Sequence, residues 1–502
     1  MNTTTLEKLT KELNAQQKQA VEMPLNSFTK VVAGAGTGKT KIISKRYIKL
    51  VYDLIKDNLV EKPLEHLLVI TFTQKAAAEM KERILKELKE NKINTLGQET
   101  RISTIHAFCS EMLKRHAIEA NLSPNFQLGE DNELQEIYDT IIRKIRYGEY
   151  ETIENLDEVL QELNLDKDIL SHENILKLKA AGTLEDIFDS VLPIIKQVKS
   201  LGLTPIEFLE KTTSAIPQYT AFLTDFSKKK YVCSHFSDIY SDEKVMAEDW
   251  SHFFQNCDYA DENYKNMPEN TAFESLLSKF VNKNGARKSP KTVAWTPIFD
   301  TNVCQMLEEI SEVEILFTKI IAIIYGTYQR QLEELDLTDF DDLINKTLYI
   351  LKNNEVIRAY YKKYFKHIIV DEFQDTSGAQ LDLLMNLLSD EEPDLTIVGD
   401  RKQSIYGFRY ARMENLDIIQ KKVEQKFKEK PNFSPDEKIK VIKLETNYRS
   451  TAQVLDAVNA VTEQSLRLDE PLSANRTENI SNSIKFTQPE TCDSMNAYRT
   501  LE

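Results

Sequence analysis

Two short segments far apart in the chain carry the residue types that bind and hydrolyse a nucleoside triphosphate. Residues 33–40 read Ala-Gly-Ala-Gly-Thr-Gly-Lys-Thr, and residues 370–376 read Val-Asp-Glu-Phe-Gln-Asp-Thr. In the first segment, glycines let backbone N–H groups cradle phosphates at the start of a helix. In the second, two carboxylates follow an apolar run that predicts a buried strand at 367–370. Together they predict a nucleotide triphosphatase site that uses ATP and Mg²⁺.

The role of each side chain follows from its chemistry. Lys39 is expected to reach the β- and γ-phosphates, and the Thr40 hydroxyl to bind Mg²⁺. Asp371, at the end of its strand, is expected to hold the same Mg²⁺. Glu372 is placed to take the proton from the attacking water. The residues predicted to surround the phosphates are Ala33, Gly34, Ala35, Gly36, Thr37, Gly38, Lys39 and Thr40.

Each segment also has a simpler interpretation. Ala33 stands where the strict phosphate-loop pattern has glycine, so the first segment taken alone is also compatible with a glycine-rich turn without a ligand. The acidic pair alone is compatible with a solvated strand end. A strand-like run at 29–32 and a helical run at 42–47 flank the glycine-rich turn. This order of strand, loop and helix favours phosphate binding.

Composition limits the class of protein. The chain has 502 residues, 41% of them hydrophobic and 29% charged, which indicates a globular protein with several domains. No run approaches the roughly 20 apolar residues of a membrane span, so we expect no membrane partner. Five scattered cysteines without a Cys-x-x-Cys pair argue against zinc, an iron–sulfur cluster or a disulfide framework. We therefore expect a cytoplasmic protein.

The overall charge is unfavourable for one class of partner. The sequence has 64 basic and 80 acidic residues and a net charge of −16. This balance argues against nucleic acid as a partner. A local basic groove on an acidic protein would still bind it.

The hydropathy pattern predicts an α/β fold interrupted by helices. Besides the runs already given, strands are expected at 67–73 and 395–398 and a helix at 76–91. Residues 116–325 are mainly helical by pattern, and the stretch 217–300 within them is polar, aromatic-rich and irregular. The lysine-rich stretch 421–440, with two prolines, is interpreted as a linker.

Ordered motifs between residues 13 and 451 make the chain resemble the UvrD/Rep-type superfamily 1 DNA helicases. Residues 13–21, Leu-Asn-Ala-Gln-Gln-Lys-Gln-Ala-Val, resemble the family's adenine-reading Q motif. The resemblance assigns Asn14 and Gln17 to ATP, and an amide that both donates and accepts suits the adenine edge. The alternative is an ordinary polar helix start.

Two further motifs resemble the family's contacts to single-stranded DNA. Residues 71–80, Thr-Phe-Thr-Gln-Lys-Ala-Ala-Ala-Glu-Met, resemble motif Ia, although the family usually has Asn where Gln74 stands. The resemblance assigns Phe72 and Thr73 to DNA, with Phe72 as a stacking platform. Residues 101–109 resemble motif Ib, which assigns Thr104 and His106 to DNA. Core packing of Phe72 and a structural role for His106 are the alternatives.

Motif III is matched by the string Val-Gly-Asp-Arg-Lys-Gln-Ser-Ile-Tyr-Gly-Phe-Arg at 398–409. The resemblance implies that Gln403 senses the γ-phosphate. It also implies that DNA is contacted by Tyr406, Phe408 and Arg409. The following residue is Tyr410, where the family commonly has glycine.

Motif IV is matched by Leu-Glu-Thr-Asn-Tyr-Arg-Ser at 444–450. The resemblance implies that Tyr448 stacks on adenine and that Arg449 reaches the γ-phosphate from the opposite domain. The alternative for Arg449 is an ordinary surface salt bridge.

Residues 104–126, 339–343 and 402–406 resemble the AddA/RecB recombination branch of the family. The implied fold is a RecA-like P-loop NTPase domain with a parallel sheet, a large helical insertion and a partial second RecA-like domain. The implied ranges are 1–115 for the first part of domain 1A, 116–325 for insertion 1B, 326–430 for the second part of 1A, and 431–502 for part of domain 2A.

The resemblance implies an ATP-dependent 3′→5′ DNA helicase and translocase of repair and recombination. Its partners would be single-stranded DNA, duplex/single-strand junctions and a second recombination subunit. Glu502 follows soon after motif IV, and we find no motifs V and VI, so we expect an N-terminal fragment of a longer motor. The alternative is a non-motor ATP-binding or scaffolding protein that lacks those motifs.

Overall fold

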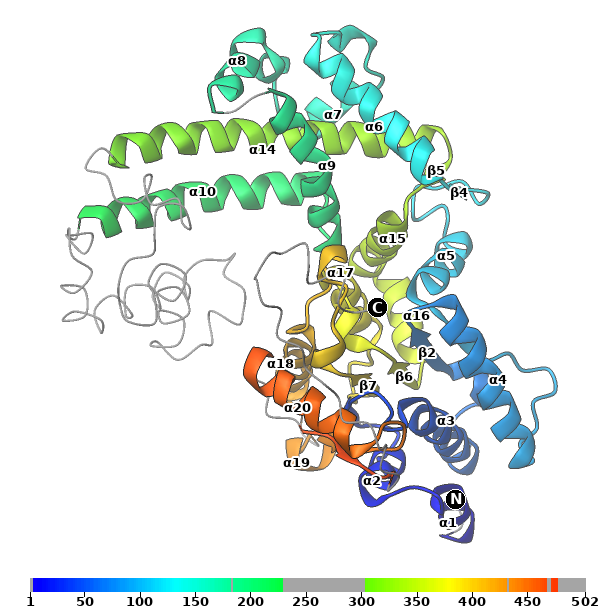
Figure 1. Cartoon of the computed structure of the whole chain (residues 1–502). Helices are drawn as coiled ribbons and strands as arrows, with labels where there is room; N and C mark the ends of the chain where they lie inside the picture. Colours follow the sequence, from blue (N-terminus) through cyan, green and yellow to red (C-terminus); the bar gives the residue numbers. More distant parts are fainter. Residues whose placement is uncertain (1–2, 182–183, 229–302, 431–432, 467–470, 477–502) are drawn as a thin grey trace.

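The computed structural model describes residues 3–181, 184–228, 303–430, 433–466 and 471–476 (Figure 1). Its centre is a six-stranded sheet in the order β3-β2-β6-β7-β1-β8, with every pair of neighbours parallel. These strands are β1 (Phe28–Ala33), β2 (Leu67–Thr71), β3 (Arg101–Thr104), β6 (His367–Val370), β7 (Leu395–Gly399) and β8 (Ile439–Leu444). The predicted α/β class and parallel P-loop sheet are confirmed.

Helices cover both faces of the sheet because successive side chains of a strand point to opposite sides. On one face, Val69, Ile369 and Val398 pack with α2 (Ala15–Glu22), α3 (Lys39–Lys56) and α4 (Gln74–Glu90). On the other, Leu68, Ile368 and Ile397 pack with a second group of helices. That group comprises α5 (Ile105–Arg115), α15 (Phe340–Asn353), α16 (Glu355–Tyr364), α17 (Gly378–Leu387) and α18 (Asn415–Phe427). The strands predicted at 29–32, 67–73, 367–370 and 395–398 are thus confirmed within one or two residues.

The predicted helical insertion is present and has its own core. It contains α6 (Asp131–Arg146), α7 (Leu156–Glu162), α8 (His172–Ala181), α9 (Leu184–Ser200), α10 (Pro205–Lys228) and α14 (Val303–Glu334). In Figure 1, α10 and α14 run side by side, while α9 descends toward α15 and α17. The short strands β4 (Gln127–Leu128) and β5 (Leu337–Thr338) pair where the chain enters and leaves the insertion. Most of the stretch 217–300 lies outside the described residues.

The insertion starts and ends about ten residues later than the expected limits of 116 and 325. Ala120 and Phe126 are buried in the core beneath the sheet, so the chain is still part of the sheet domain there. At the other end, α14 continues to Glu334 and buries Tyr328 and Leu332 in the insertion's core. Apolar packing partners, which are not local in sequence, set both limits.

The expected linker at 421–440 is wrong for its first part, because α18 extends to Phe427. Its lysines lie between Leu416, Ile419, Val423 and Phe427, which are buried and recur every three or four residues. The strand β8 also differs from the expected domain boundary at 431. It pairs with β1 along its whole length, from Phe28↔Ile439 to Ala33↔Leu444, and so completes the first sheet.

The remaining elements are short or lie outside the sheet. They are α1 (Thr3–Thr10), α19 (Pro435–Lys438), α20 (Ala452–Leu466), β9 (Thr446–Asn447) and β10 (Ser473–Ala474). β9 and β10 form a separate parallel pair. Among the described residues, none of the helices is long and apolar enough to cross a membrane.

Asp394, just before β7, should make stability depend on pH. Its side chain is 5% exposed, its Oδ1 has no hydrogen-bond partner in the described part of the chain, and burial raises its pKa to about 8. An acid whose pKa is raised by folding destabilises the fold increasingly from about pH 4 to pH 8. We expect Asp394→Asn to stabilise the protein at pH 8, with about 5 kcal/mol as the upper limit set by a shift of about four pKa units, and to change its stability little at pH 4.

Thermal unfolding at pH 4, 6 and 8 measures this difference. A matched control is Asp390→Asn on the same loop. The ion pairs of Asp390 with Lys362 and Lys426 outweigh the effect of its burial and lower its pKa, so this change should destabilise the protein at pH 8. Equal melting temperatures of Asp394→Asn and the unmodified protein at pH 8 would contradict the assignment.

Candidate nucleotide site and nucleic-acid surface

The glycine-rich turn connects the end of β1 to the start of α3 at the carboxyl edge of the sheet. Gly36 and Gly38 have φ values of 75° and 92°, in the left-handed region that glycine adopts without strain. A Cβ on Gly36 would also come within 2.7 Å of the Arg449 Cβ. The Thr37 hydroxyl donates to the Gly34 carbonyl at 2.7 Å and closes the turn. This is the geometry that presents backbone N–H groups to phosphates at a helix N-terminus.

Lys39 brings together three segments that are distant in sequence. Its Nζ lies 2.7 Å from both carboxylate oxygens of Glu372 and 3.3 Å from the Gln403 Oε1. β6, β7 and β1 are adjacent in the sheet, so the residues that follow β6 and β7 meet the turn that follows β1. Ligands of open α/β sheets bind at this edge.

The acidic pair is held by the sheet and by its own backbone. The Asp371 N–H donates to the Ile70 carbonyl at 2.9 Å, and the Asp371 Oδ1 accepts from the Glu372 N–H at 3.0 Å. Glu372 has a φ of 50°, a conformation that non-glycine residues adopt mostly where the surroundings enforce it. Burial and the Glu372 charge raise the pKa of Asp371 to about 6. A bound cation would relieve this repulsion.

Thr40 and Asp371 fit Mg²⁺ by chemistry, since both offer oxygen atoms. The described residues hold no cluster of three or more His, Cys, Asp or Glu side chains suited to a metal. Mg²⁺ in nucleotide sites takes only one or two protein ligands and completes its shell with phosphate and water oxygens. Two protein oxygens are therefore enough for the predicted role of Thr40 and Asp371.

Gln374 is a site residue that the sequence reasoning missed. It lies in the 3₁₀ turn η6 (Phe373–Asp375) and is 1% exposed. Its Nε2 donates to Glu372 Oε2 at 2.8 Å, and its Oε1 accepts from the Asp400 N–H at 2.9 Å. A Cβ on Gly399 would approach that Oε1 to 2.7 Å, so a larger residue there would displace the Gln374 amide. The available signal in the sequence was the amide side chain of Gln374, two residues after the predicted base Glu372.

The amide of Gln403 closes the same network from the next strand end. Gln403 ends η7 (Arg401–Gln403), and its Nε2 donates to Asp400 Oδ2 at 2.6 Å while its Oε1 faces Lys39. The orientation of this amide is therefore fixed by Asp400. The catalytic residues predicted from the sequence, apart from Arg449, thus form one contact network around Lys39.

The predicted adenine residues lie beside the glycine-rich turn. Gln17 is buried, and its Nε2 donates to the Thr37 carbonyl at 2.9 Å. Asn14 and Gln17 also form a capping box at the start of α2. The alternative interpretation, an ordinary polar helix start, therefore also describes these residues. The Asn14 Nδ2 donates to the Tyr448 hydroxyl at 2.9 Å. Two segments 434 residues apart therefore meet at this edge.

The segment after β8 lies directly on the turn. Asn447 Nδ2 donates to the Ala35 carbonyl at 2.6 Å, and the Tyr448 N–H donates to the Gly36 carbonyl at 2.9 Å. The Asn447 Oδ1 accepts from the Arg449 N–H at 2.8 Å. These bonds bring the backbone of Arg449 beside Gly36.

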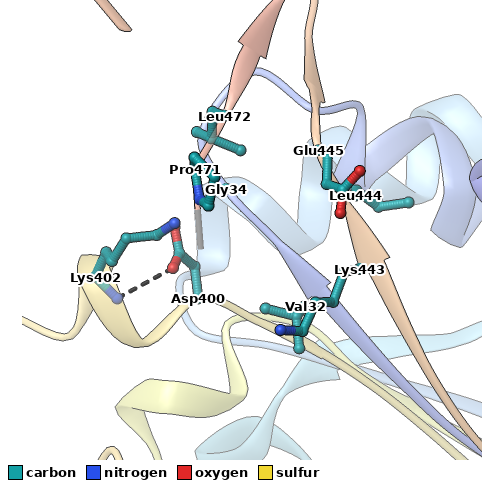
Figure 2. Close-up of a pocket in the computed structure, with 9 residues that line it drawn as sticks. All are labelled: Val32, Gly34, Asp400, Lys402, Lys443, Leu444, Glu445, Pro471 and Leu472. Atoms are coloured by element: carbon teal, nitrogen blue, oxygen red, sulfur yellow. Dashed lines mark hydrogen bonds between the residues drawn. The ribbon is translucent and has the colours of Figure 1, made fainter. Parts of the chain in front are cut away.

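A small pocket of about 60 Å³ is lined in part by Gly34 of the glycine-rich turn. Figure 2 shows its lining residues: Val32, Gly34, Asp400, Lys402, Lys443, Leu444, Glu445, Pro471 and Leu472. Neither Lys39 nor Glu372 lines it, and ligand pockets usually measure about 300 Å³ or more. This pocket is therefore separate from the predicted triphosphatase residues around Lys39.

Three aromatic side chains form a patch at the same edge of the sheet, which we call the aromatic patch: Phe72, Tyr406 and Phe408. The ring centroids of Phe72 and Tyr406 are 4.6 Å apart, and those of Tyr406 and Phe408 are 5.8 Å apart. Phe408 is 73% exposed, and the Arg409 guanidinium lies 5.7 Å from the centroids of Tyr406 and Phe408. Phe72 and Tyr406 are half-buried, so Phe408 is the exposed ring of the patch, and an exposed ring next to a cation suits a stacked base.

The other predicted nucleic-acid residues have structural contacts too. The hydroxyls of Thr73 and Thr104 accept from backbone N–H groups at the starts of α4 and α5, at 3.1 and 3.2 Å. His106 meets Phe340 edge-on at 5.4 Å, and burial together with Arg409 lowers the pKa of His106. Both effects favour the neutral form of the imidazole in this structure. Phe340, 55% exposed, received no role from the sequence.

A family model described as the UvrD/REP helicase N-terminal domain matches residues 13–424. Among curated proteins, the chain is similar to a subunit of an ATP-dependent helicase/nuclease from Listeria welshimeri, with 28% identity over 86% of the chain. It is also similar to the proteins of the same name from Listeria innocua, at 29% identity over 86% of the chain, and from Clostridium beijerinckii, at 27% over 89%. In each case the chain spans about 38% of the relative's length.

Proposed function

Since the chain belongs to the family of UvrD/REP helicase N-terminal domains, we propose that it carries the ATP-hydrolysing and strand-binding parts of a DNA helicase. One observation carries the proposal above all: Lys39 Nζ lies within 3.3 Å of both Glu372 and Gln403, at the start of the helix that follows the glycine-rich turn. A γ-phosphate that contacts Lys39 there comes within reach of the proposed base and the proposed sensor.

The proposed reaction is attack of water on the γ-phosphorus of ATP with loss of ADP. The oxygen of the water bonds to the γ-phosphorus while Glu372 takes the proton of the water. The bond between the γ-phosphorus and the β–γ bridging oxygen breaks. Lys39 and the N–H groups of the turn bind the phosphates, and Arg449 approaches the γ-phosphate from the segment that follows β8. Mg²⁺ held by Thr40 and Asp371 would neutralise charge on the phosphates.

The proposed DNA path runs over the aromatic patch. Bases stack on Phe72, Tyr406 and Phe408, and stacking accepts every base because each has a π face. Thr73, Thr104, His106 and Arg409 would contact the strand beside it. Gln403 and Tyr406 are only three residues apart, so a shift of Gln403 on the γ-phosphate moves the stacking surface. Alternation of these states would drive the protein along the strand.

We further propose 3′→5′ movement and a role in DNA repair and recombination in the cytoplasm. The names of the relatives describe one subunit of an ATP-dependent helicase/nuclease, which supports a second protein chain as a partner. DNA junctions as substrates are proposed from the resemblance of the motifs. In domain terms, the sheet with α2–α5 and α15–α18 forms 1A and the helical insertion forms 1B. The chain after β8 is proposed to begin domain 2A.

Replacement of Phe408 by alanine tests the DNA path. Loss of one stacking ring should weaken binding of an oligothymidylate by about 5- to 100-fold, since stacking contributes roughly 1–3 kcal/mol per base. Fluorescence anisotropy with a labelled strand measures this. The control is Tyr349→Ala on α15, an exposed ring outside the patch that is 52% exposed. Equal affinities of Phe408→Ala and the unmodified chain would refute the proposed path.

A further inference from the structure

Tyr410 joins the loop of the aromatic patch to the helical insertion. Its hydroxyl donates to the main-chain oxygen of Pro193 at 2.9 Å, across 217 residues of sequence. Pro193 lies inside α9, the insertion helix that Figure 1 shows descending toward the sheet domain. Tyr410 follows η8 (Gly407–Arg409), directly after the residues of the proposed DNA path. The bond therefore links the loop of the proposed DNA path to the helical insertion.

The backbone at Tyr410 is unfavourable for a tyrosine. Its φ is 60° and its ψ 19°, in the left-handed region, where glycine would sit without strain. The turn is closed by the Tyr410 N–H, which donates to the Gly407 carbonyl at 2.9 Å. A strained residue persists where its surroundings hold it, and the contact with Pro193 is the side-chain hydrogen bond that does so here.

α9 is itself fixed to the sheet domain by a buried cation. Lys199 is 1% exposed, and its Nζ lies 2.6 Å from Asp339 Oδ2 and 2.9 Å from Asp342 Oδ2, at the start of α15. Burial alone would lower the pKa of Lys199, but the two carboxylates raise it well above its ordinary value. Lys199 is six residues beyond Pro193, or about 9 Å along a helix. Pro193 therefore belongs to a firmly held segment.

Two rings of α14 complete the anchor. Tyr325 and Tyr328 place their ring centroids 5.6 and 5.0 Å from the Lys199 Nζ, and Gln329 donates to Asp342 Oδ1 at 2.9 Å. The Asn345 Nδ2 donates to the Lys199 carbonyl at 3.0 Å. Helices α9, α14 and α15 thus meet around one ammonium group. These buried polar contacts tie the three helices together.

The loop that carries Tyr410 begins at the nucleotide side. Gln403 faces Lys39 at 3.3 Å, and Tyr406 packs on Phe72. Beyond Tyr410, the Arg412 N–H donates to the Thr376 carbonyl at 3.1 Å, which fixes the far end of the loop to the segment after the acidic pair. Between these two fixed ends, residues 403–410 contact first the P-loop lysine, then the stacking ring, and finally the insertion.

We propose that Tyr410 is a positioning residue that makes the grip on DNA depend on the nucleotide, by bracing the 403–410 loop against α9. This inference rests on the proposed function. With the hydroxyl bond in place, a shift of Gln403 moves Tyr406 and Phe408 relative to a fixed insertion. Without it, the end of the loop yields, and the same shift no longer changes the stacking surface. Tyr410 contacts neither the nucleotide network nor the patch through this hydroxyl, so it acts through the loop.

The test is the ratio of oligothymidylate dissociation constants measured without and with Mg²⁺ and a non-hydrolysable ATP analogue. Tyr410→Phe removes only the hydroxyl. We expect it to keep the affinity for the analogue and to move the ratio toward one by about two- to tenfold, the effect of one hydrogen bond. Tyr147→Phe in the insertion, where Tyr147 is 71% exposed, should leave the ratio unchanged.

A second variant separates coupling from folding. Tyr410→Gly relieves the left-handed strain, so it should melt at the same or a higher temperature and still lose the coupling. If the unmodified chain shows a ratio different from one and Tyr410→Phe shows the same ratio, the inference is overturned and the proposed function stands. If the unmodified chain binds neither ligand, or its ratio equals one, the proposed function fails and the inference fails with it.

Discussion

Lys39→Ala should abolish measurable binding of ATP. The Lys39 ammonium sits at the start of α3, is largely buried, and contacts both Glu372 and Gln403. Its removal takes away a charge-assisted contact to phosphate and leaves Glu372 facing the phosphates without a counter-charge. Together these effects should weaken binding by about 100-fold or more, since a hydrogen bond to a charged group contributes roughly 1.5–3 kcal/mol.

Titration with a fluorescent ATP analogue in the presence of Mg²⁺ measures the affinity. A matched control is Lys41→Ala, two residues further along the same helix, where the lysine pairs with Glu12 on the surface at 3.2 Å. That variant should bind the analogue normally, because an exposed pair contributes little. If Lys39→Ala keeps the affinity of the unmodified chain, the glycine-rich turn is not a nucleotide site.

Glu372→Gln should leave ATP and Mg²⁺ binding intact and lower the rate of hydrolysis by about 10²- to 10⁴-fold. Glutamine has nearly the same shape and keeps an oxygen toward Lys39, but it cannot accept the proton of the attacking water. Gln374 Nε2, which donates to the carboxylate at 2.8 Å, still has an oxygen to face in the variant. The change therefore removes the base and one of the two oxygens that Lys39 contacts, while the shape of the side chain is kept.

The rate of phosphate release at saturating ATP and Mg²⁺ measures this effect. Glu372→Asp is the informative companion, because it keeps a base but withdraws it from Lys39 by one methylene. We expect an intermediate rate for it. Hydrolysis by Glu372→Gln at the rate of the unmodified chain would remove Glu372 as the base.

Local sequence was sufficient for the nucleotide half of the site. The glycines of the turn, Lys39 and the acidic pair are contiguous strings whose backbone environment, strand then turn then helix, is visible as a hydropathy pattern. Their meeting around Lys39 follows from parallel strands whose carboxyl ends share one edge. The order of strands was not visible, because the pairing of β8 with β1 joins residues about 410 apart in sequence.

Charge obscured another element. The lysines of α18 suggested a linker, yet Leu416, Ile419 and Val423 bury one face of a helix against the sheet. Counting charges without tracing the three- and four-residue spacing of apolar residues gave the wrong assignment there. The expected end of the insertion at residue 325 was too early because α14 continues as one helix to Glu334.

The contacts between motifs were beyond sequence reasoning. Gln374 bridges Glu372 and Asp400 only because β6 and β7 are neighbours. Tyr410 was noted as a departure from the glycine of related helicases, but its partner is a main-chain oxygen of the insertion, which no side-chain pattern marks. Such links depend on the three-dimensional fold rather than on residue type.

The most direct test of the account is the ATPase rate of this chain with and without single-stranded DNA, beside Glu372→Gln. If the nucleotide network and the aromatic patch are coupled through residues 403–410, the rate should rise as oligothymidylate is added and level off when the DNA site is full. The Glu372→Gln variant should show no such rise while still binding the strand. An ATPase rate that DNA leaves unchanged at saturating binding would contradict the coupling.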